Sequence, residues 1–221
     1  MDIRVADTDA DAAMYAATLV AEWLRGAVDR RGSAAVAFSG GSTPVAMLEC
    51  LGSLDVPWPA VQVFQVDERC VPDLDPTRNA RLLDLLGAPQ ENLHLMPVTA
   101  PDLAAACERH ALELPDRFDV VHLGLGDDGH TASWPPGDGV VDVEADVALS
   151  GEYRGTVRMT LTPRVVNRAR RRLMLVAGVS KAAAVSRWLL DDDSQPVSRL
   201  RRNDTVIVLD RAAASGLPPQ G

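Results

Sequence analysis

One histidine follows a short apolar segment, in a stretch whose residue types favour a strand and then a loop. Residues 120–125 (VVHLGL) are β-branched at their start and are followed by Gly126, as expected for a strand buried on both faces of a parallel sheet. The tetrapeptide DDGH follows at 127–130. Ligands of open α/β folds bind outside the carboxyl ends of the strands, so His130 lies where a reacting group is expected. A lone histidine that merely caps a turn is the alternative.

The same loop has a glycine pattern that resembles a dinucleotide-binding fingerprint. Gly124, Gly126 and Gly129 show the GxGxxG spacing after a predicted strand. Two carboxylates inside the turn would repel a pyrophosphate, and the prolines at 135–136 stop any long helix after the loop. We therefore disfavour a dinucleotide site and expect residues 131–134 to form only a brief helical turn.

A glycine-serine run follows another predicted strand, at residues 33–38. Pro44 suits the first position of a helix and the two residues before it can cap that helix, so backbone N–H groups of the run point outward. Such groups and the helix dipole attract phosphate, and glycine allows close approach. A hydroxyl-capped turn is the alternative, and neither GxxxxGK nor GxSxG is present. The predicted phosphate cradle consists of Gly40, Gly41, Ser42 and Thr43.

Charged side chains stand in or after two further predicted strands. Asp67, Glu68 and Arg69 follow a strand at residues 61–66, which makes theirs the third predicted strand end with polar residues of unusual type. The strand predicted at 156–161 alternates in polarity, which puts Arg158 on the opposite face from its two apolar neighbours. Solvated turn residues are the alternative for the first group.

Lys181 is the only lysine among 22 basic residues. We expect Ser180 to cap a helix that runs to residue 190, which places Lys181 in the first turn, where the helix dipole disfavours a cation. A bound anion explains a compact ammonium at that position, and chance composition is the alternative.

The remaining segments alternate between helical and extended patterns. Helices are predicted at about 8–27, 44–52, 80–86, 101–114, 163–169 and 181–190 and after Asp210, and strands at 33–38, 61–66, 93–96, 120–125, 156–161, 172–177 and 205–209. Residues 140–149 suggest a surface strand or an excursion, and whether residues 140–153 close over a site is left open. His122 is expected to be a hydrogen-bonded core residue, and residues 1–10 show no apolar segment.

Composition limits the classes of partner. The 221 residues are 47% hydrophobic, without a low-complexity linker, and we expect residues 1–221 to form one domain. A net charge of −9 disfavours nucleic acid and anionic membranes, so an anionic ligand needs locally concentrated cations. No signal peptide or membrane span is expected. The three cysteines lack CxxC spacing, which favours a reducing cytoplasm and core thiols over structural zinc.

Strand and loop units in this order resemble the 6-phosphogluconolactonase family over nearly the whole chain. The residues that carry the resemblance are the SGGSTP run at 39–44, DER at 67–69 with Asn79, GxGxDGHTAS at 124–133, Arg158 with Thr160, AG at 177–178 with Lys181, and LD at 209–210. The family implies a cytoplasmic hydrolase of the pentose phosphate pathway with a single-domain, three-layer αβα fold, a Rossmann-like mostly parallel sheet and no cofactor. Related glucosamine-6-phosphate deaminases usually carry tyrosine where Arg69 stands, so Arg69 favours the lactonase.

The resemblance also implies a role for each site residue. The substrate is 6-phosphoglucono-1,5-lactone, with its phosphate on residues 40–43 and Lys181. His130 acts as general base on water and then returns the proton to the ring oxygen, Arg69 stabilises the oxyanion, and Asp128 or Asp67 orients the imidazole. Asp67 and Arg158 are assigned to substrate binding, and no metal is required.

Two departures from the family pattern concern the sugar pocket. Arg78 stands where serine is more frequent, and Trp134 with Pro135 replaces a common Leu-Phe pair. These changes question the shape of the pocket and leave the reaction class unaffected. A glucosamine-6-phosphate deaminase and a non-catalytic sugar-phosphate sensor are the alternative functions.

Overall fold

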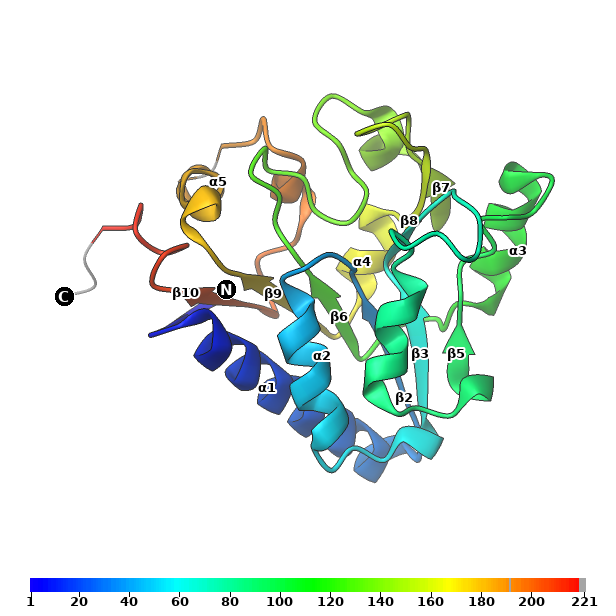
Figure 1. The fold of residues 1–221 in the computed structure, drawn as a ribbon, viewed down its shortest axis with the longest axis horizontal. Helices are drawn as coiled ribbons and strands as arrows, with labels where there is room; N and C mark the ends of the chain where they lie inside the picture. The colour runs from blue at the N-terminus through cyan, green and yellow to red at the C-terminus, as the bar shows by residue number, and fades with distance from the viewer. Residues whose placement is uncertain (191, 219–221) are drawn as a thin grey trace.

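The structure is a computed structural model that describes residues 1–190 and 192–218. Within those ranges one seven-stranded sheet has the order β1-β10-β9-β6-β2-β3-β5, and every neighbouring pair is parallel (Figure 1). Its strands are β1 (Asp2–Ala6), β2 (Ala34–Phe38), β3 (Val61–Gln65), β5 (Leu93–His94), β6 (Val120–Leu123), β9 (Arg171–Val176) and β10 (Thr205–Asp210).

The order of the strands creates a switch point between β2 and β6. From β2 the chain adds β3 and then β5 on one side, and it then returns to place β6, β9 and β10 on the other. The loops that leave β2 and β6 therefore diverge from adjacent strands, and the backbone N–H of Ser39 donates to the carbonyl of His122 at 3.2 Å. Ligands of open α/β sheets bind at this kind of position.

Helices cover both faces of the sheet and produce three layers, as predicted (Figure 1). Residues of α1 (Asp9–Arg31), α2 (Pro44–Ser53) and the 3₁₀ segment η2 (Ala80–Leu86) form one core cluster with the sheet. Those of α3 (Leu103–Glu113), α4 (Pro163–Arg168) and α5 (Ala182–Leu189) belong to the cluster on the other face. The shorter 3₁₀ segments are η1 (Trp58–Ala60), η3 (Gln90–Asn92), η4 (Gly139–Asp142), η5 (Val179–Lys181) and η6 (Pro196–Arg199).

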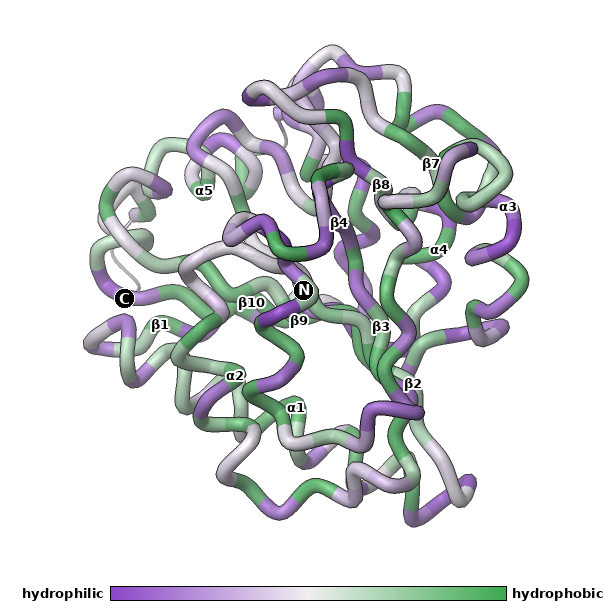
Figure 2. Tube along the Cα trace, turned by 45° about the vertical axis from the view of Figure 1, so that its right-hand side comes forward, coloured by the Kyte–Doolittle hydropathy of each residue, from purple (hydrophilic) through white to green (hydrophobic). Residues whose placement is uncertain are grey.

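The strands supply the two cores alternately because successive side chains point to opposite faces. Ala35 and Ala37 of β2 join the α3 to α5 side, whereas Val36 and Phe38 join the α1 side. All residues of β2 and β6 are buried, and Figure 2 shows hydrophobic stretches through the middle of the molecule. No helix of the described ranges combines the length and apolar character needed to cross a membrane.

A small antiparallel sheet stands above the carboxyl end of β3. Among the described residues it contains three strands in the order β4 (Asp67–Arg69), β8 (Arg158–Leu161) and β7 (Val147–Leu149). The register sets Asp67 opposite Thr160 and Arg69 opposite Arg158, so these four side chains share one face. The charged residues that were predicted to follow a strand thus belong to a strand of this small sheet. The face that carries Asp67, Arg69, Arg158 and Thr160 is called the wall below.

Glu68 lies on the opposite face of β4 and is fully buried. Its carboxylate accepts from the backbone N–H groups of Asn79 and Ala80, each at 2.8 Å, and pairs with Arg78 at 3.1 Å. These bonds fasten the start of η2 beneath the wall, because a buried carboxylate is tolerated only when its oxygens are satisfied.

Several predicted elements were wrong. No element was predicted for residues 1–6, yet Asp2–Ala6 forms the edge strand β1, which pairs only with β10 among the described strands and leaves polar residues exposed. The closing helix expected after Asp210 is a series of turns, in which the Asp210 carboxylate accepts from the N–H of Ala213 at 2.7 Å. Residues 140–149, which were hard to place, contain most of η4 and the short strand β7.

Candidate active site

A cleft of about 380 Å³ opens at the switch point, outside the carboxyl ends of β2 and β6. The glycine-serine turn (residues 40–43), the wall formed by β4 and β8, and the start of α5 all contribute to its lining. Asp128 is absent from the lining but contacts His130, which does line the cleft. The predicted site residues found in the lining are Gly40, Gly41, Ser42, Thr43, Asp67, Arg69, His130, Arg158 and Lys181.

His130 is held in a defined tautomer by Asp128. Asp128 Oδ1 lies 2.6 Å from His130 Nδ1 and 3.1 Å from the backbone nitrogen of the same residue. Burial alone would raise the pKa of Asp128, but hydrogen bonds from Tyr153 and His130 outweigh it and lower that pKa to about 2. A carboxylate only accepts hydrogen bonds, so the proton of a neutral imidazole sits on Nδ1. Nε2 then carries the lone pair, and no described residue hydrogen-bonds it.

Of the two carboxylates left open by the sequence, only Asp128 contacts the imidazole. Asp67 accepts instead from the Ser133 hydroxyl at 2.6 Å. Burial raises the pKa of Asp67, although that hydrogen bond and the charge of Arg158 act in the opposite direction. The geometry therefore fits Asp67 for a contact in the cleft and not for orienting the base.

Gly126 and Gly129 shape the loop that carries the histidine. Gly129 has a φ of +86°, in the left-handed region that favours glycine. A Cβ at Gly126 would lie 2.0 Å from His130 Nδ1, so only glycine leaves room for the ring. Of the glycines that resemble a dinucleotide fingerprint, Gly126 thus leaves space for the imidazole, and Gly129 permits the turn just before it.

The glycine-serine turn presents unused donors to the cleft. Thr43 is the residue before α2, but neither it nor Ser42 makes the expected capping bond to the helix, so the hydroxyl-cap interpretation is wrong. The backbone N–H groups of residues 40–43 take part in no hydrogen bond with the rest of the described chain. An anion at the amino end of α2 therefore finds both free donors and the positive end of the helix dipole.

Lys181 stands on another rim of the cleft. The expected cap at Ser180 is absent: a short 3₁₀ turn, Val179–Lys181, precedes α5, and Lys181 itself is the residue before the helix. The ammonium forms no ion pair with the described residues. The pKa of nearby Asp127 is lowered mainly by a hydrogen bond from Arg154, and the charge of Lys181 is the next largest cause.

Arg69 and Arg158 face each other across the small sheet. Arg69 Nη1 donates to the carbonyl of Thr77 and to Asn79 Oδ1 at 3.1 Å. Arg158 is only 8% exposed, and its Nε has no hydrogen-bond partner in the described chain. Like charges directly opposite in a sheet are destabilising, so this pair favours the presence of an anion between them.

Sequence reasoning missed Tyr153 and Arg154, which also line the cleft. The Tyr153 hydroxyl lies 2.5 Å from Asp128 Oδ2 and 3.2 Å from His130 Nδ1. Arg154 Nη2 donates to Asp127 Oδ1 at 2.9 Å. The one local signal was the glycine at position 155, which is typical of a turn. A Tyr-Arg-Gly turn does not indicate which distant loop its side chains will contact, so the two residues could not be assigned to the site.

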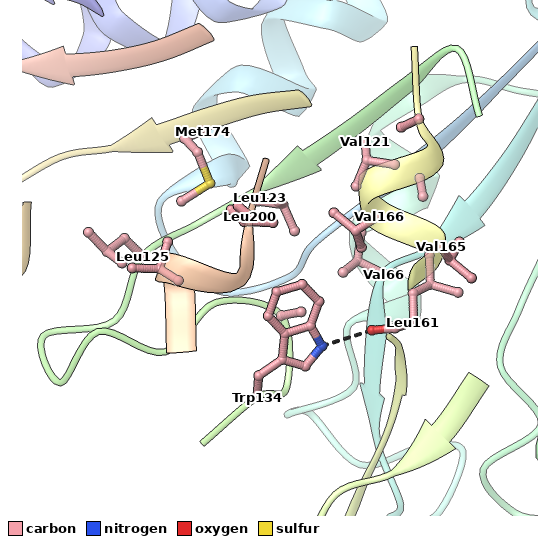
Figure 3. Close-up of a cluster of buried hydrophobic side chains, with 14 of the residues drawn as sticks. Val66, Val121, Leu123, Leu125, Trp134, Leu161, Val165, Val166, Met174 and Leu200 are labelled. Atoms are coloured by element: carbon pink, nitrogen blue, oxygen red, sulfur yellow. Dashed lines mark hydrogen bonds between the residues drawn. The ribbon is translucent and has the colours of Figure 1, made fainter. Parts of the chain in front are cut away.

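The two departures from the family pattern lie outside the cleft lining. Arg78 is buried against Glu68 and Asp73. Trp134 is fully buried, donates its Nε1 proton to the Leu161 carbonyl at 2.8 Å, and lies among aliphatic side chains such as Val66 (Figure 3). The brief helical turn expected at 131–134 is a tight turn closed by a bridge between Thr131 and Trp134. None of these side chains therefore lines the cleft.

His122 is buried beside Phe38, on the α1 side of the sheet, and plays no part in the cleft lining. It was expected to be hydrogen-bonded, but neither ring nitrogen finds a partner among the described residues. Burial lowers the pKa of His122 to about 3, so the ring is neutral near neutral pH.

Comparison with known proteins identifies the relatives of this arrangement. The model of the family described as glucosamine-6-phosphate isomerases/6-phosphogluconolactonase matches residues 7–208. A 6-phosphogluconolactonase from Synechocystis sp. is 34% identical over 212 residues, which cover 87% of this chain and 88% of that protein.

Solved structures agree with this result. A 6-phosphogluconolactonase from Shewanella baltica superposes with a TM-score of 0.86 at 26% identity, covering 95% of this chain and 97% of that one. A monomeric glucosamine-6-phosphate deaminase has a TM-score of 0.87 at 21% identity and covers 98% of this chain and 100% of its own, which shows a common fold. The chain therefore belongs to the glucosamine-6-phosphate isomerase/6-phosphogluconolactonase family.

Proposed function

We propose that this protein hydrolyses 6-phospho-D-glucono-1,5-lactone to 6-phospho-D-gluconate in the oxidative pentose phosphate pathway. The observation that carries the proposal is one cleft lined by the His130 imidazole, the glycine-serine turn and Lys181. His130 provides a base with a free Nε2. The glycine-serine turn and Lys181 provide a binding site for the phosphate in another part of the same cleft. The relatives from Synechocystis and Shewanella are both 6-phosphogluconolactonases, which supports the same activity.

The phosphate is held by the free N–H groups of residues 40–43 and by the Lys181 ammonium. Cations of the cleft wall (Arg69, Arg154 and Arg158) add to this positive site in a chain whose net charge is −9. A positive cleft in an acidic protein attracts and orients small anions by electrostatic focusing. The seat fixes the tail of the substrate, so that the lactone carbonyl comes to lie near His130.

The reaction begins when His130 Nε2 takes a proton from water as the water oxygen attacks the lactone carbonyl. Negative charge develops on the carbonyl oxygen, and the fixed guanidinium of Arg69 stabilises it, with Arg158 opposite. The tetrahedral intermediate then collapses, the bond to the ring oxygen breaks, and His130 returns the proton to that oxygen. Asp128 stabilises the imidazolium that exists between the two proton transfers.

This reaction draws on no cofactor, because water, one base and fixed cations supply every step. We also propose that the protein acts in the cytoplasm on this sugar phosphate and not on nucleic acid or a membrane. The net charge supports the choice of partner, and the cysteines, which are free in the described residues, agree with a reducing compartment.

The test is a lactonase assay of the purified protein, corrected for the spontaneous opening of the lactone. We expect turnover by the wild type and a loss of roughly 10²- to 10⁴-fold in kcat for His130→Ala, the range typical of a general base. Release of ammonia from glucosamine 6-phosphate would instead identify a deaminase. Binding of 6-phosphogluconate without any effect on lactone lifetime would identify a sensor, and either result would overturn the proposal.

A further inference from the structure

A tight turn at residues 153–156, here called the tyrosine turn, meets the loop of His130. The backbones of Tyr153 and Thr156 exchange two hydrogen bonds, at 3.0 and 3.3 Å. Arg154 and Gly155 between them have φ values of 51° and 82°, as in the two-residue turns that join hairpin strands. Adjacent side chains of this turn reach the adjacent carboxylates of Asp127 and Asp128.

The protons around Asp128 leave one consistent arrangement. The carboxylate has no proton to give, so the Tyr153 hydroxyl donates to Oδ2 while His130 Nδ1 donates to Oδ1. Each carboxylate oxygen thus has its own donor, and rotation of the carboxylate would break both bonds. The Tyr153 hydroxyl therefore restrains the Asp128 carboxylate, which in turn restrains the imidazole of His130.

Contacts of the phenol ring hold the hydroxyl in place. The guanidinium carbons of Arg154 and Arg158 lie 5.1 and 5.4 Å from the ring centroid. The ring of His130 meets the phenol ring edge-on at 5.3 Å between centroids. These contacts depend on the aromatic ring and not on the hydroxyl, so phenylalanine at position 153 retains them.

We propose that Tyr153 is a positioning residue for the reaction at His130, acting through the hydrogen bond from its hydroxyl to Asp128. This inference rests on the proposed function and adds a residue that the sequence did not identify. The bond has two effects. It fixes the orientation of the imidazole through Asp128, and it compensates part of the negative charge of the Asp128 carboxylate, which would otherwise stabilise the imidazolium more strongly.

The substitution Tyr153→Phe removes only the hydroxyl. We expect kcat for the lactone to fall roughly 10-fold, the scale of one hydrogen bond to a charged group, with KM unchanged within about twofold. The acid limb of the kcat/KM profile moves to higher pH, because the carboxylate that has lost one donor stabilises the imidazolium more strongly. A purely structural role for Tyr153 would not move that limb.

Two further variants make the test specific. Tyr15→Phe removes a hydroxyl from α1, outside the cleft lining, and leaves kcat and the pH profile unchanged. The double variant Tyr153→Phe with Asp128→Asn is no slower than Asp128→Asn alone, because the tyrosine acts only through that carboxylate. Full additivity of the two losses, or an unchanged kcat and pH profile for Tyr153→Phe, would overturn the inference.

The NMR signal of the His130 Nδ1 proton separates this inference from the proposed function. That proton lies in the hydrogen bond to Asp128, and the other charged groups near the pair, which are Asp127, Arg154, Arg158 and Lys181, stay in place in Tyr153→Phe. We expect this signal to shift in the variant whether or not the lactone is the substrate. An inactive wild type with a shifted signal would reject the lactone alone, whereas an unchanged signal would reject the role of Tyr153.

Discussion

Replacing His122 with leucine should remove one defined part of the acid sensitivity of this fold. The imidazole is 1% exposed, and neither nitrogen has a partner among the described residues. Burial lowers the pKa of His122 to about 3, whereas histidine in an unfolded chain titrates near about 6.5. Between those values the unfolded state binds a proton that the folded state does not. Stability is therefore lost as the pH falls from about 6.5 towards 3.

The size of the effect follows from the two pKa values. Between about pH 7 and pH 4.5 the single site costs the wild type roughly 2.5 kcal/mol of unfolding free energy. Leucine cannot bind the proton, so His122→Leu does not suffer this loss. At neutral pH the variant is as stable as the wild type or more so, because two unpaired buried polar atoms have been removed.

Urea unfolding followed by the fluorescence of the four tryptophans measures this difference at about pH 7 and about pH 4.5. Other groups that titrate contribute equally to both proteins and cancel. Val121→Ala is a matched control, since it lies next to His122 in β6, is fully buried and loses roughly 2 kcal/mol at both pH values. If the wild type and His122→Leu lose stability in parallel on acidification, the assignment of a buried neutral histidine is wrong.

Two further predictions concern the cleft. Lys181→Ala should raise KM for the phosphorylated lactone roughly 10-fold with little change in kcat, the effect of losing one charge-assisted bond to the phosphate; steady-state kinetics showing an unchanged KM would move the phosphate elsewhere. Gly126→Ala should reduce kcat at least about 10-fold, because the new methyl would lie 2.0 Å from His130 Nδ1, whereas Gly139→Ala, with no atom within 4 Å, should retain activity. Equal activity of the two alanine variants would contradict the described packing of the imidazole.

The strands and the loops after them were predictable because their signals are local. Buried parallel strands appear as short apolar runs, and the predicted strands at 33–38, 61–66 and 120–125 correspond to β2, β3 and β6. Each predicted strand is followed by residues that suggest a binding or catalytic site: the glycine-serine run after the first, the charged triplet 67–69 after the second and the loop of His130 after the third. In a parallel sheet the ends of such strands lie on one edge, which brought the glycine-serine turn, Asp67 and His130 into one cleft.

Elements whose formation depends on distant partners were not predictable. The strand β1 carries alternating polar residues and exists because β10 offers it an edge. The triplet 67–69 was predicted to follow a strand, and it forms a strand of its own because β8, from far along the chain, pairs with it. The predicted helix caps were wrong both at Ser42 or Thr43 and at Ser180, since none of these hydroxyls makes a capping bond. At Ser180 a 3₁₀ turn also delays the start of α5.

The sequence by itself determined the α/β architecture, the family resemblance and the set of residues that can do the chemistry, since these depend on residue types and short spacings. Only the tertiary structure showed that Asp128, and not Asp67, contacts the His130 imidazole, since Asp67 accepts a hydrogen bond from Ser133 instead. It alone also brought Tyr153 to that carboxylate. A contact between side chains 25 residues apart depends on how two loops are packed, and no local pattern records that packing.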